Sequence, residues 1–168
     1  TGTWSSVGGV KLDPANPAAF VAKQGHGVIL NSPGGKTVDL FSVIEHGDAE
    51  VHVEFNVPKG SNSGVYLQGR YEVQVFDSYG KTNLTHGDCG GFYERWAGNR
   101  GYEGHAPPVN ASRRPGKWQR LDIVFRAPRF DATDPSLLPP GDMPARVKAL
   151  VGGDPRMDDP VFFTRSVL

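Results

Sequence analysis

Several features that would restrict the fold or the partners are absent from this sequence. Cys89 is the single cysteine, so no internal disulfide can form, and we expect a small buried residue there rather than a nucleophile. The 18 Lys and Arg residues balance 18 Asp and Glu residues, which argues against nucleic acid or an anionic membrane surface as the main partner. No run of about 18 apolar residues is present, so the sequence predicts no segment that spans a bilayer.

Glycine and proline are instead abundant, with 22 and 14 residues in a chain of 168. This composition is typical of many short strands joined by turns rather than of a helical bundle. Strand-like alternation recurs at Trp118–Phe125, and closing strands are expected at 146–151 and 160–168. A helix near 14–20 is the exception, and long loops are expected at 94–117 and 131–144. We therefore predict one all-β domain over residues 1–168, an antiparallel β-sandwich with a polar, concave sheet face.

The most informative segment is 62–78, which we interpret as one continuous strand. With a period of two, one side carries the polar side chains of Tyr66, Gln68, Arg70, Glu72 and Gln74. The other side carries apolar side chains that can seal a core. A row of hydrogen-bonding groups of this kind can line a groove, and the groove would suit a densely hydroxylated ligand. The expected partner is therefore a carbohydrate.

A second alternating segment precedes it at Glu50–Val57. His52 and Glu54 fall on its polar side, and valine and phenylalanine fall on its apolar side. A turn-like segment at 58–64 joins the two strands, so we expect them to pair as neighbours in one sheet. This arrangement would place Glu54 beside Glu72.

Several blocks of the sequence resemble the 3-keto-disaccharide hydrolase family, formerly a domain of unknown function. The blocks are Val51–Phe55, Asn62–Tyr66, Gly69–Tyr79, Cys89–Tyr93, Pro107–Ser112 and Pro115–Gln119, the last running on to Phe125–Phe130. The blocks follow the family's order, and the resemblance extends over roughly residues 40 to 150. The resemblance implies a jelly-roll sandwich similar to concanavalin-like lectins and glucanases. It also implies bacterial, extracytoplasmic carbohydrate metabolism. A chain beginning at Thr1 agrees with a removed signal peptide or with a trimmed amino terminus, and the sequence does not separate the two. The segment before residue 40 matches poorly, and a hairpin typical of the family is missing near Val151–Pro155.

Two kinds of cleavage chemistry follow from these residues. A conventional two-carboxylate glycosidase would need Glu72 together with Asp77, which faces the other side of a regular strand. One β-bulge between them would return Asp77 to the polar face. The resemblance implies the second chemistry, in which a base removes the acidic C2 proton of a 3-keto sugar and the C1 substituent is eliminated, with net hydrolysis after water addition.

For this elimination the candidate bases are Glu72 and Glu54, and Arg70 is the candidate that stabilises the enolate. Substrate hydroxyls would be oriented by His52, Asn62, Tyr66, Gln68 and Gln74. A divalent metal could replace Arg70, with ligands from His52 and Glu54 or from His86 and Asp88, although no spacing here is a strong ligand signature. A structural ion pair between Arg70 and Glu72 is the main alternative to a catalytic role.

Three functions remain open from the sequence. The first is an enzyme that cleaves 3-keto glycosides, and the second is a non-catalytic carbohydrate-binding module on the same fold. The third is a conventional glycosidase acting on unoxidised glucans. The sequence specifies neither the glycoside nor an oligomeric state.

Overall fold

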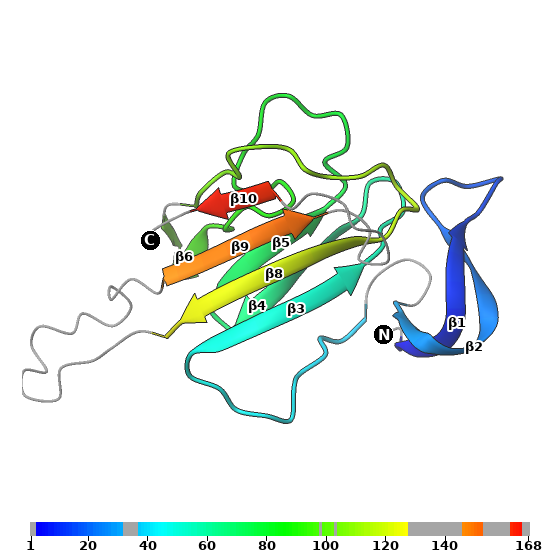
Figure 1. Cartoon of the computed structure of the whole chain (residues 1–168), viewed down its shortest axis with the longest axis horizontal. Helices are drawn as coiled ribbons and strands as arrows, with labels where there is room; N and C mark the ends of the chain where they lie inside the picture. Colours follow the sequence, from blue (N-terminus) through cyan, green and yellow to red (C-terminus); the bar gives the residue numbers. More distant parts are fainter. Residues whose placement is uncertain are drawn as a thin grey trace, which may run out of the picture.

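The structure is a computed structural model that describes residues 3–31, 37–97, 99–102, 104–127, 146–152 and 162–165. Within these ranges the chain forms strands joined by turns and no helix, and every paired strand is antiparallel, which confirms the all-β prediction (Figure 1). The strands are β1 (Ser5–Leu12), β2 (Phe20–Leu30), β3 (Ala49–Phe55), β4 (Asn62–Leu67), β5 (Tyr71–Phe76), β6 (Arg95–Ala97), β7 (Arg100–Tyr102), β8 (Gln119–Arg126), β9 (Arg146–Gly152) and β10 (Phe162–Arg165).

The larger sheet has the strand order β10-β9-β8-β3. Its central strand β8 alternates as predicted, with Leu121, Ile123 and Phe125 at most 1% exposed and the residues between them only partly buried. Strand β3 pairs with β8 in a register that places Val53 opposite Leu121. The closing strands expected near the carboxyl end are present as β9 and β10.

The second layer is built on the β4–β5 hairpin. It continues through the segment 90–93, where Phe92 forms bridges with Val73 of β5 and with His105. Hydrogen bonds of 2.8 to 3.0 Å fasten this segment to β5, including those from Tyr93 N–H to Glu72 C=O and from Gly90 N–H to Gln74 C=O. Residues 90–93 therefore extend this layer beyond β5 by bridge-type pairing.

The two layers pack face to face and enclose the core. Leu67, Tyr71, Val73 and Val75 from the hairpin meet the buried residues of β8, and the Tyr71 and Phe125 rings lie 5.7 Å apart between centroids. Figure 1 shows the larger sheet lying across β4 and β5. Cys89 belongs to this core at 3% exposure, and burial raises the pKa of its thiol, which confirms the prediction of a buried residue.

The segment 62–78 is not one strand, contrary to our interpretation. The chain reverses at Gln68 and Gly69, whose φ angles of 53° and 61° are both left-handed, as type I′ turns require. The Arg70 N–H donates to the Leu67 carbonyl at 3.1 Å and closes the turn. Glycine at 69 suits this conformation because it lacks a Cβ.

The expected pairing of β3 with β4 is also wrong. β3 lies in the larger sheet and pairs with β8, whereas β4 lies in the other layer and pairs with β5. The turn-like residues 56–61 therefore connect the two layers instead of making a hairpin. The polar side chains of β3 and of β4, although close in sequence, consequently face opposite sides of the sandwich.

The amino-terminal region forms a separate β1–β2 hairpin at one end of the sandwich (Figure 1). The helix expected near 14–20 is absent, because Asp13 and Asn16 accept hydrogen bonds from the N–H groups two residues ahead and form turns. Strand β2 begins directly afterwards at Phe20.

The loop expected at 131–144 lies outside the described residues. So do residues 153–155, in the segment where a hairpin typical of the family is missing from the sequence. Within the described ranges no helix is long and apolar enough to cross a membrane.

Candidate functional site

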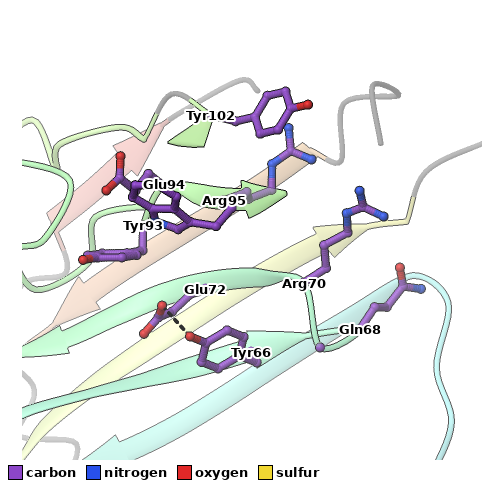
Figure 2. Close-up of a pocket in the computed structure, with 10 residues that line it drawn as sticks. Tyr66, Gln68, Arg70, Glu72, Tyr93, Glu94, Arg95 and Tyr102 are labelled. Carbon is purple, nitrogen blue, oxygen red and sulfur yellow. Dashed lines mark hydrogen bonds between the residues drawn. The ribbon is translucent and has the colours of Figure 1, made fainter. Parts of the chain in front are cut away.

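An open pocket of about 560 Å³ lies on the outer side of the β4–β5 layer, a volume within the usual range for small-ligand sites. One wall comes from the β4–β5 hairpin, and the other comes from the segment that runs from Tyr93 into the β6–β7 hairpin (Figure 2). The lining residues are Tyr66, Gln68, Gly69, Arg70, Glu72, Tyr93, Glu94, Arg95, Trp96 and Tyr102.

Tyr66 and Glu72 form the centre of the hairpin wall. They are direct cross-strand partners on β4 and β5, and the Tyr66 hydroxyl donates to Glu72 Oε2 at 2.7 Å (Figure 2). Partial burial, followed by the hydrogen bond and the charge of Glu72, raises the pKa of Tyr66 to about 12. The phenol therefore stays protonated at neutral pH and remains a hydrogen-bond donor to the carboxylate.

Gly64 makes room for the Glu72 side chain. A Cβ at position 64 would lie 2.1 Å from Glu72 Oε1 and 2.7 Å from its Cγ, closer than any real contact. The carboxylate therefore rests on the bare backbone of β4. A glycine at this point in a strand is unusual unless another group approaches the backbone closely.

Gln74 supports Glu72 from beneath the pocket. It is only 3% exposed, so its amide needs internal partners. With its nitrogen turned toward these oxygens, Gln74 donates to the Ser63 carbonyl at 2.9 Å and to Glu72 Oε1 at 3.1 Å. In this orientation the Gln74 side-chain oxygen lies 3.2 Å from the Asn62 side-chain oxygen. Gln74 thus contributes to the position of Glu72, and neither Gln74 nor Asn62 lines the pocket.

The opposite wall contains residues that our sequence interpretation left inside a long loop. Tyr93, Glu94 and Trp96 stand on it, and Trp96 is 60% exposed. Glu94 Oε1 lies 3.9 Å from His86 Nε2. In the sequence, the signal for this wall is the group of aromatic residues at 93, 96 and 102, whose side chains could stack on sugar rings, although packing under a long loop explained them equally well. Nothing in the local pattern indicated that it would face Glu72.

The pocket is electrically polarised along its length. Figure 2 shows the carboxylates of Glu72 and Glu94 at one end and the guanidinium groups of Arg70 and Arg95 at the other. Arg70 belongs to the hairpin turn and Gln68 lies beside it, donating to the His46 carbonyl at 3.3 Å. Among the residues that the structure describes, no carboxylate lies within ion-pair distance of Arg70, so it forms no ion pair with Glu72.

Glu54 and His52 do not join this site. They stand on the outer face of the larger sheet, which is the opposite side of the sandwich from Glu72, because β3 pairs with β8. There His52 Nδ1 hydrogen-bonds to the Asp122 carboxylate, and His52 Nε2 lies 3.8 Å from Glu54 Oε1. The expectation that Glu54 would lie beside Glu72 is wrong, and the structure favours a surface charge cluster for this group.

Asp77 is likewise away from the pocket. The β4–β5 register contains no bulge, so the rearrangement that would have returned Asp77 to the polar face is absent. Its carboxylate instead accepts hydrogen bonds from the backbone N–H of Gly60 at 2.9 Å and of Tyr79 at 3.4 Å. Asp77 therefore ties together two turns at the end of the hairpin.

The residues suggested for a divalent metal do not fit one. Within the described ranges no three His, Cys, Asp or Glu side chains form a group that could hold a metal ion. The Asp88 oxygens are already used by Ser78, Lys81 and Thr85, and His86 turns toward Glu94. We therefore derive no chemistry from a metal.

The family of the chain follows from comparison with known proteins. The model of the 3-keto-alpha-glucoside-1,2-lyase-like domain matches residues 2–158. The chain belongs to this family. The resemblance to 3-keto-disaccharide hydrolases is thus confirmed, and the match includes the segment before residue 40 that we expected to fit poorly.

Among curated proteins none matches the chain. A solved structure of a candidate glycosyl hydrolase from Parabacteroides distasonis is similar, with a TM-score of 0.51 and 26% sequence identity. The alignment covers 76% of this chain and 49% of the other, so this chain spans about half the length of that protein. The likeness agrees with the antiparallel sandwich described above.

Proposed function

We propose that this chain cleaves 3-keto glycosides by removing the C2 proton and eliminating the C1 substituent. The observation that carries the proposal is the carboxylate of Glu72, held by Tyr66 and Gln74 at the wall of an open pocket. A positioned base of this kind is what the first step requires. Family membership supports the same substrate class.

The reaction balances without an oxidant, because the substrate already carries its ketone. Glu72 accepts the C2 proton, and the electron pair of the C2–H bond forms an enolate across C2 and C3. The C3 carbonyl then re-forms as the C1–O bond breaks, which leaves a double bond between C1 and C2 and releases an alcohol. Water adds across this double bond, and the net result is hydrolysis.

Two further residues have roles in this scheme. We assign Tyr66 as the donor to the enolate oxygen: its hydroxyl stays protonated at neutral pH, and once Glu72 has taken up the C2 proton this hydroxyl is free to turn from the carboxyl group to the enolate oxygen. We assign Glu94, on the facing wall, as the acid: in its protonated form it gives its proton to the leaving oxygen, and it takes one back from the water whose hydroxyl adds to C1, while Glu72 returns the other proton to C2. Arg70, our candidate from the sequence for the enolate, lies at the other end of the pocket and receives no role in the elimination.

The direct test uses 4-nitrophenyl 3-keto-glucosides of both anomeric configurations. We expect release of nitrophenol from one anomer, and no release from the unoxidised glucosides, because these lack the acidic C2 proton. Absorbance of the phenolate measures both. Binding of the keto sugar without release would favour the non-catalytic module, and release from unoxidised glucosides would favour a conventional glycosidase. Either result would contradict the proposal.

Gly64 offers a second test of the role of Glu72. In Gly64→Ala the new methyl group must push the Glu72 carboxylate aside, because it would otherwise lie 2.1 Å from Oε1. Displacement of a catalytic group by about 1 Å can lower the rate by about 10²-fold, so we expect a loss of kcat of that order. Stability should change by less than about 1 kcal/mol, since a flexible side chain gives way rather than the backbone.

The matched control for this change is Gly47→Ala, where an added Cβ meets nothing within 4 Å. It should leave both kcat and the melting temperature unchanged. Full activity in Gly64→Ala would mean that the described position of Glu72 has no importance for turnover.

A further inference from the structure

Trp96 is the most exposed aromatic residue of the pocket lining, and it has no part in the proposed elimination. It is 60% exposed, against 56% for Tyr66, while Tyr93 and Tyr102 are partly buried. A single exposed aromatic residue is ordinary on a protein surface and needs no explanation by itself. Trp96 differs because it stands in a pocket wall and because its neighbours hold the indole in place.

The indole of Trp96 rests on the bare backbone of Gly101. These two residues are direct cross-strand partners in the β6–β7 hairpin. A Cβ at position 101 would lie 3.4 Å from Trp96 Cζ2 and 3.5 Å from Cη2, so the six-membered part of the indole lies against a residue without a side chain. An aromatic side chain that covers a cross-strand glycine in this way stabilises the strand pair. The ring is therefore in place before a ligand binds, which lowers the entropy that binding costs.

Glu94 borders the same spot on this wall (Figure 2). The Cβ position at Gly101 lies 3.2 Å from Glu94 Oε2, as well as 3.4 Å from Trp96 Cζ2. The proposed acid and the indole are therefore neighbours. Because Glu94 would give its proton to the leaving oxygen, the group carried by that oxygen comes within reach of the indole.

An indole face suits a feature that sugar rings and aryl groups share. The face of an aromatic ring carries partial negative charge. A glucopyranose ring presents slightly positive axial C–H groups from each of its faces, and an aryl group presents a flat face for offset stacking. Contacts of this kind depend on the shape of the ring and little on the positions of its polar groups, as in the stacking of nucleic-acid bases on aromatic side chains.

We propose that Trp96 is a stacking platform for the leaving group of the substrate. It recognises the flat face of a ring rather than a pattern of hydroxyl groups, so aryl glycosides and disaccharides are accepted alike. The inference rests on the proposed function, because it places the leaving oxygen at Glu94. A leaving group without a ring, such as methanol, gains nothing from the platform.

The test is a binding titration that does not depend on turnover. Calorimetry would compare phenyl glucoside and a glucose disaccharide with methyl glucoside, each unoxidised and in both anomeric configurations. In one configuration we expect both ring ligands to bind about tenfold more tightly than methyl glucoside, the upper part of the range for an aromatic contact. A preference for only one of the two ring ligands would contradict the inference, because the flat ring face is common to both.

Variants connect the preference to the indole. Trp96→Ala should abolish the preference for ring ligands, and folding is not at risk because the residue is mostly exposed. Trp96→Phe keeps an aromatic face and should keep part of the preference. Tyr79→Ala is the matched control, since Tyr79 is 58% exposed but lies outside the pocket lining, and it should leave the preference unchanged. Equal binding of all three glucosides, no measurable binding, or a preference that survives Trp96→Ala would overturn the inference.

The platform and the elimination can fail separately. Release of nitrophenol from 3-keto-glucosides by the parent protein decides the elimination, whereas the titration uses unoxidised glucosides that the protein is not expected to cleave. Cleavage without a preference for ring ligands would overturn the platform alone. A preference that depends on Trp96, without cleavage, would overturn the elimination and leave the platform as a sugar-binding surface.

Discussion

Replacing Glu72 by Gln is expected to lower kcat for a 3-keto-glucoside by about 10²-fold to 10⁴-fold, the usual contribution of a positioned general base. Gln has nearly the same shape and can still accept the hydrogen bond from Tyr66. The change therefore removes the basic group while leaving the pocket in place. KM should stay within about threefold, since the interaction that is lost is made in the transition state. Steady-state kinetics measures both quantities.

Glu54→Gln is the matched control for this prediction. It is the same substitution at the other candidate base from the sequence, but Glu54 lies 47% exposed on the outer face of the larger sheet. We expect no change in kcat. Full activity in Glu72→Gln, or an equal loss in Glu54→Gln, would refute the assignment of Glu72 as the base.

Glu94→Gln separates the base from the acid. A residue that protonates the leaving oxygen contributes little when the leaving group is an activated phenol and much more when it is a sugar alcohol. The variant should therefore keep most activity toward the nitrophenyl substrate and lose it toward a 3-keto-disaccharide. A uniform loss toward both would contradict the assigned role of Glu94.

The pairing of Tyr66 with Glu72 shows how far the sequence pattern reaches. Alternation places both residues on the polar side of a single strand, and the hairpin keeps them on one side because its loop has three residues, 68–70, so that the register joins positions of the same parity. The side of each residue was therefore predicted correctly, although a two-residue loop would have paired Tyr66 with Tyr71 instead. The hairpin itself was not, since Gln68-Gly69 is a weaker turn signal than Asn-Gly or Asp-Gly.

The remaining errors in the sequence interpretation come from pairing between strands that lie far apart in the sequence. Val53 of β3 and Leu121 of β8 are partners, and no local pattern distinguishes this pairing from one with the next strand along the chain. Sequential strands are usual neighbours, so the ordinary expectation placed Glu54 beside Glu72. That the residues from Tyr93 to Tyr102 form a wall facing Glu72 was not predictable for the same reason, because their position depends on Phe92 bridging to Val73.

Asp88 is a buried carboxylate away from the pocket, and we expect its replacement to have a large effect on stability. Asp88 is fully buried and accepts hydrogen bonds from the Ser78 hydroxyl at 2.7 Å and from the Thr85 N–H at 2.9 Å, while Lys81 Nζ lies 2.7 Å away. Burial alone raises the pKa of Asp88, but the hydrogen bonds from Lys81, Thr85 and Ser78 outweigh it, so the pKa lies below its usual value. The ionised carboxylate therefore fastens the loop after β5 to the core.

We expect Asp88→Asn to lower the free energy of unfolding by about 2–4 kcal/mol, because it removes the charge and turns an amide N–H₂ toward groups that are donors. For a chain of this length that corresponds to a fall of roughly 5–15 °C in the melting temperature. Asp77→Asn is the control, since Asp77 also accepts backbone N–H groups but is more exposed. It should cost about 1 kcal/mol or less.

Acid should reduce the difference in the free energy of unfolding between the parent protein and Asp88→Asn. Because the pKa of Asp88 is lower in the folded than in the unfolded state, its contribution is fully present above the unfolded value of about 4 and is lost as the pH falls through the folded value. Chemical denaturation at pH 7 and near pH 3 would therefore give a large difference at neutral pH and a smaller one in acid. A difference that stays constant or grows on acidification would show that the charge of Asp88 does not stabilise the fold.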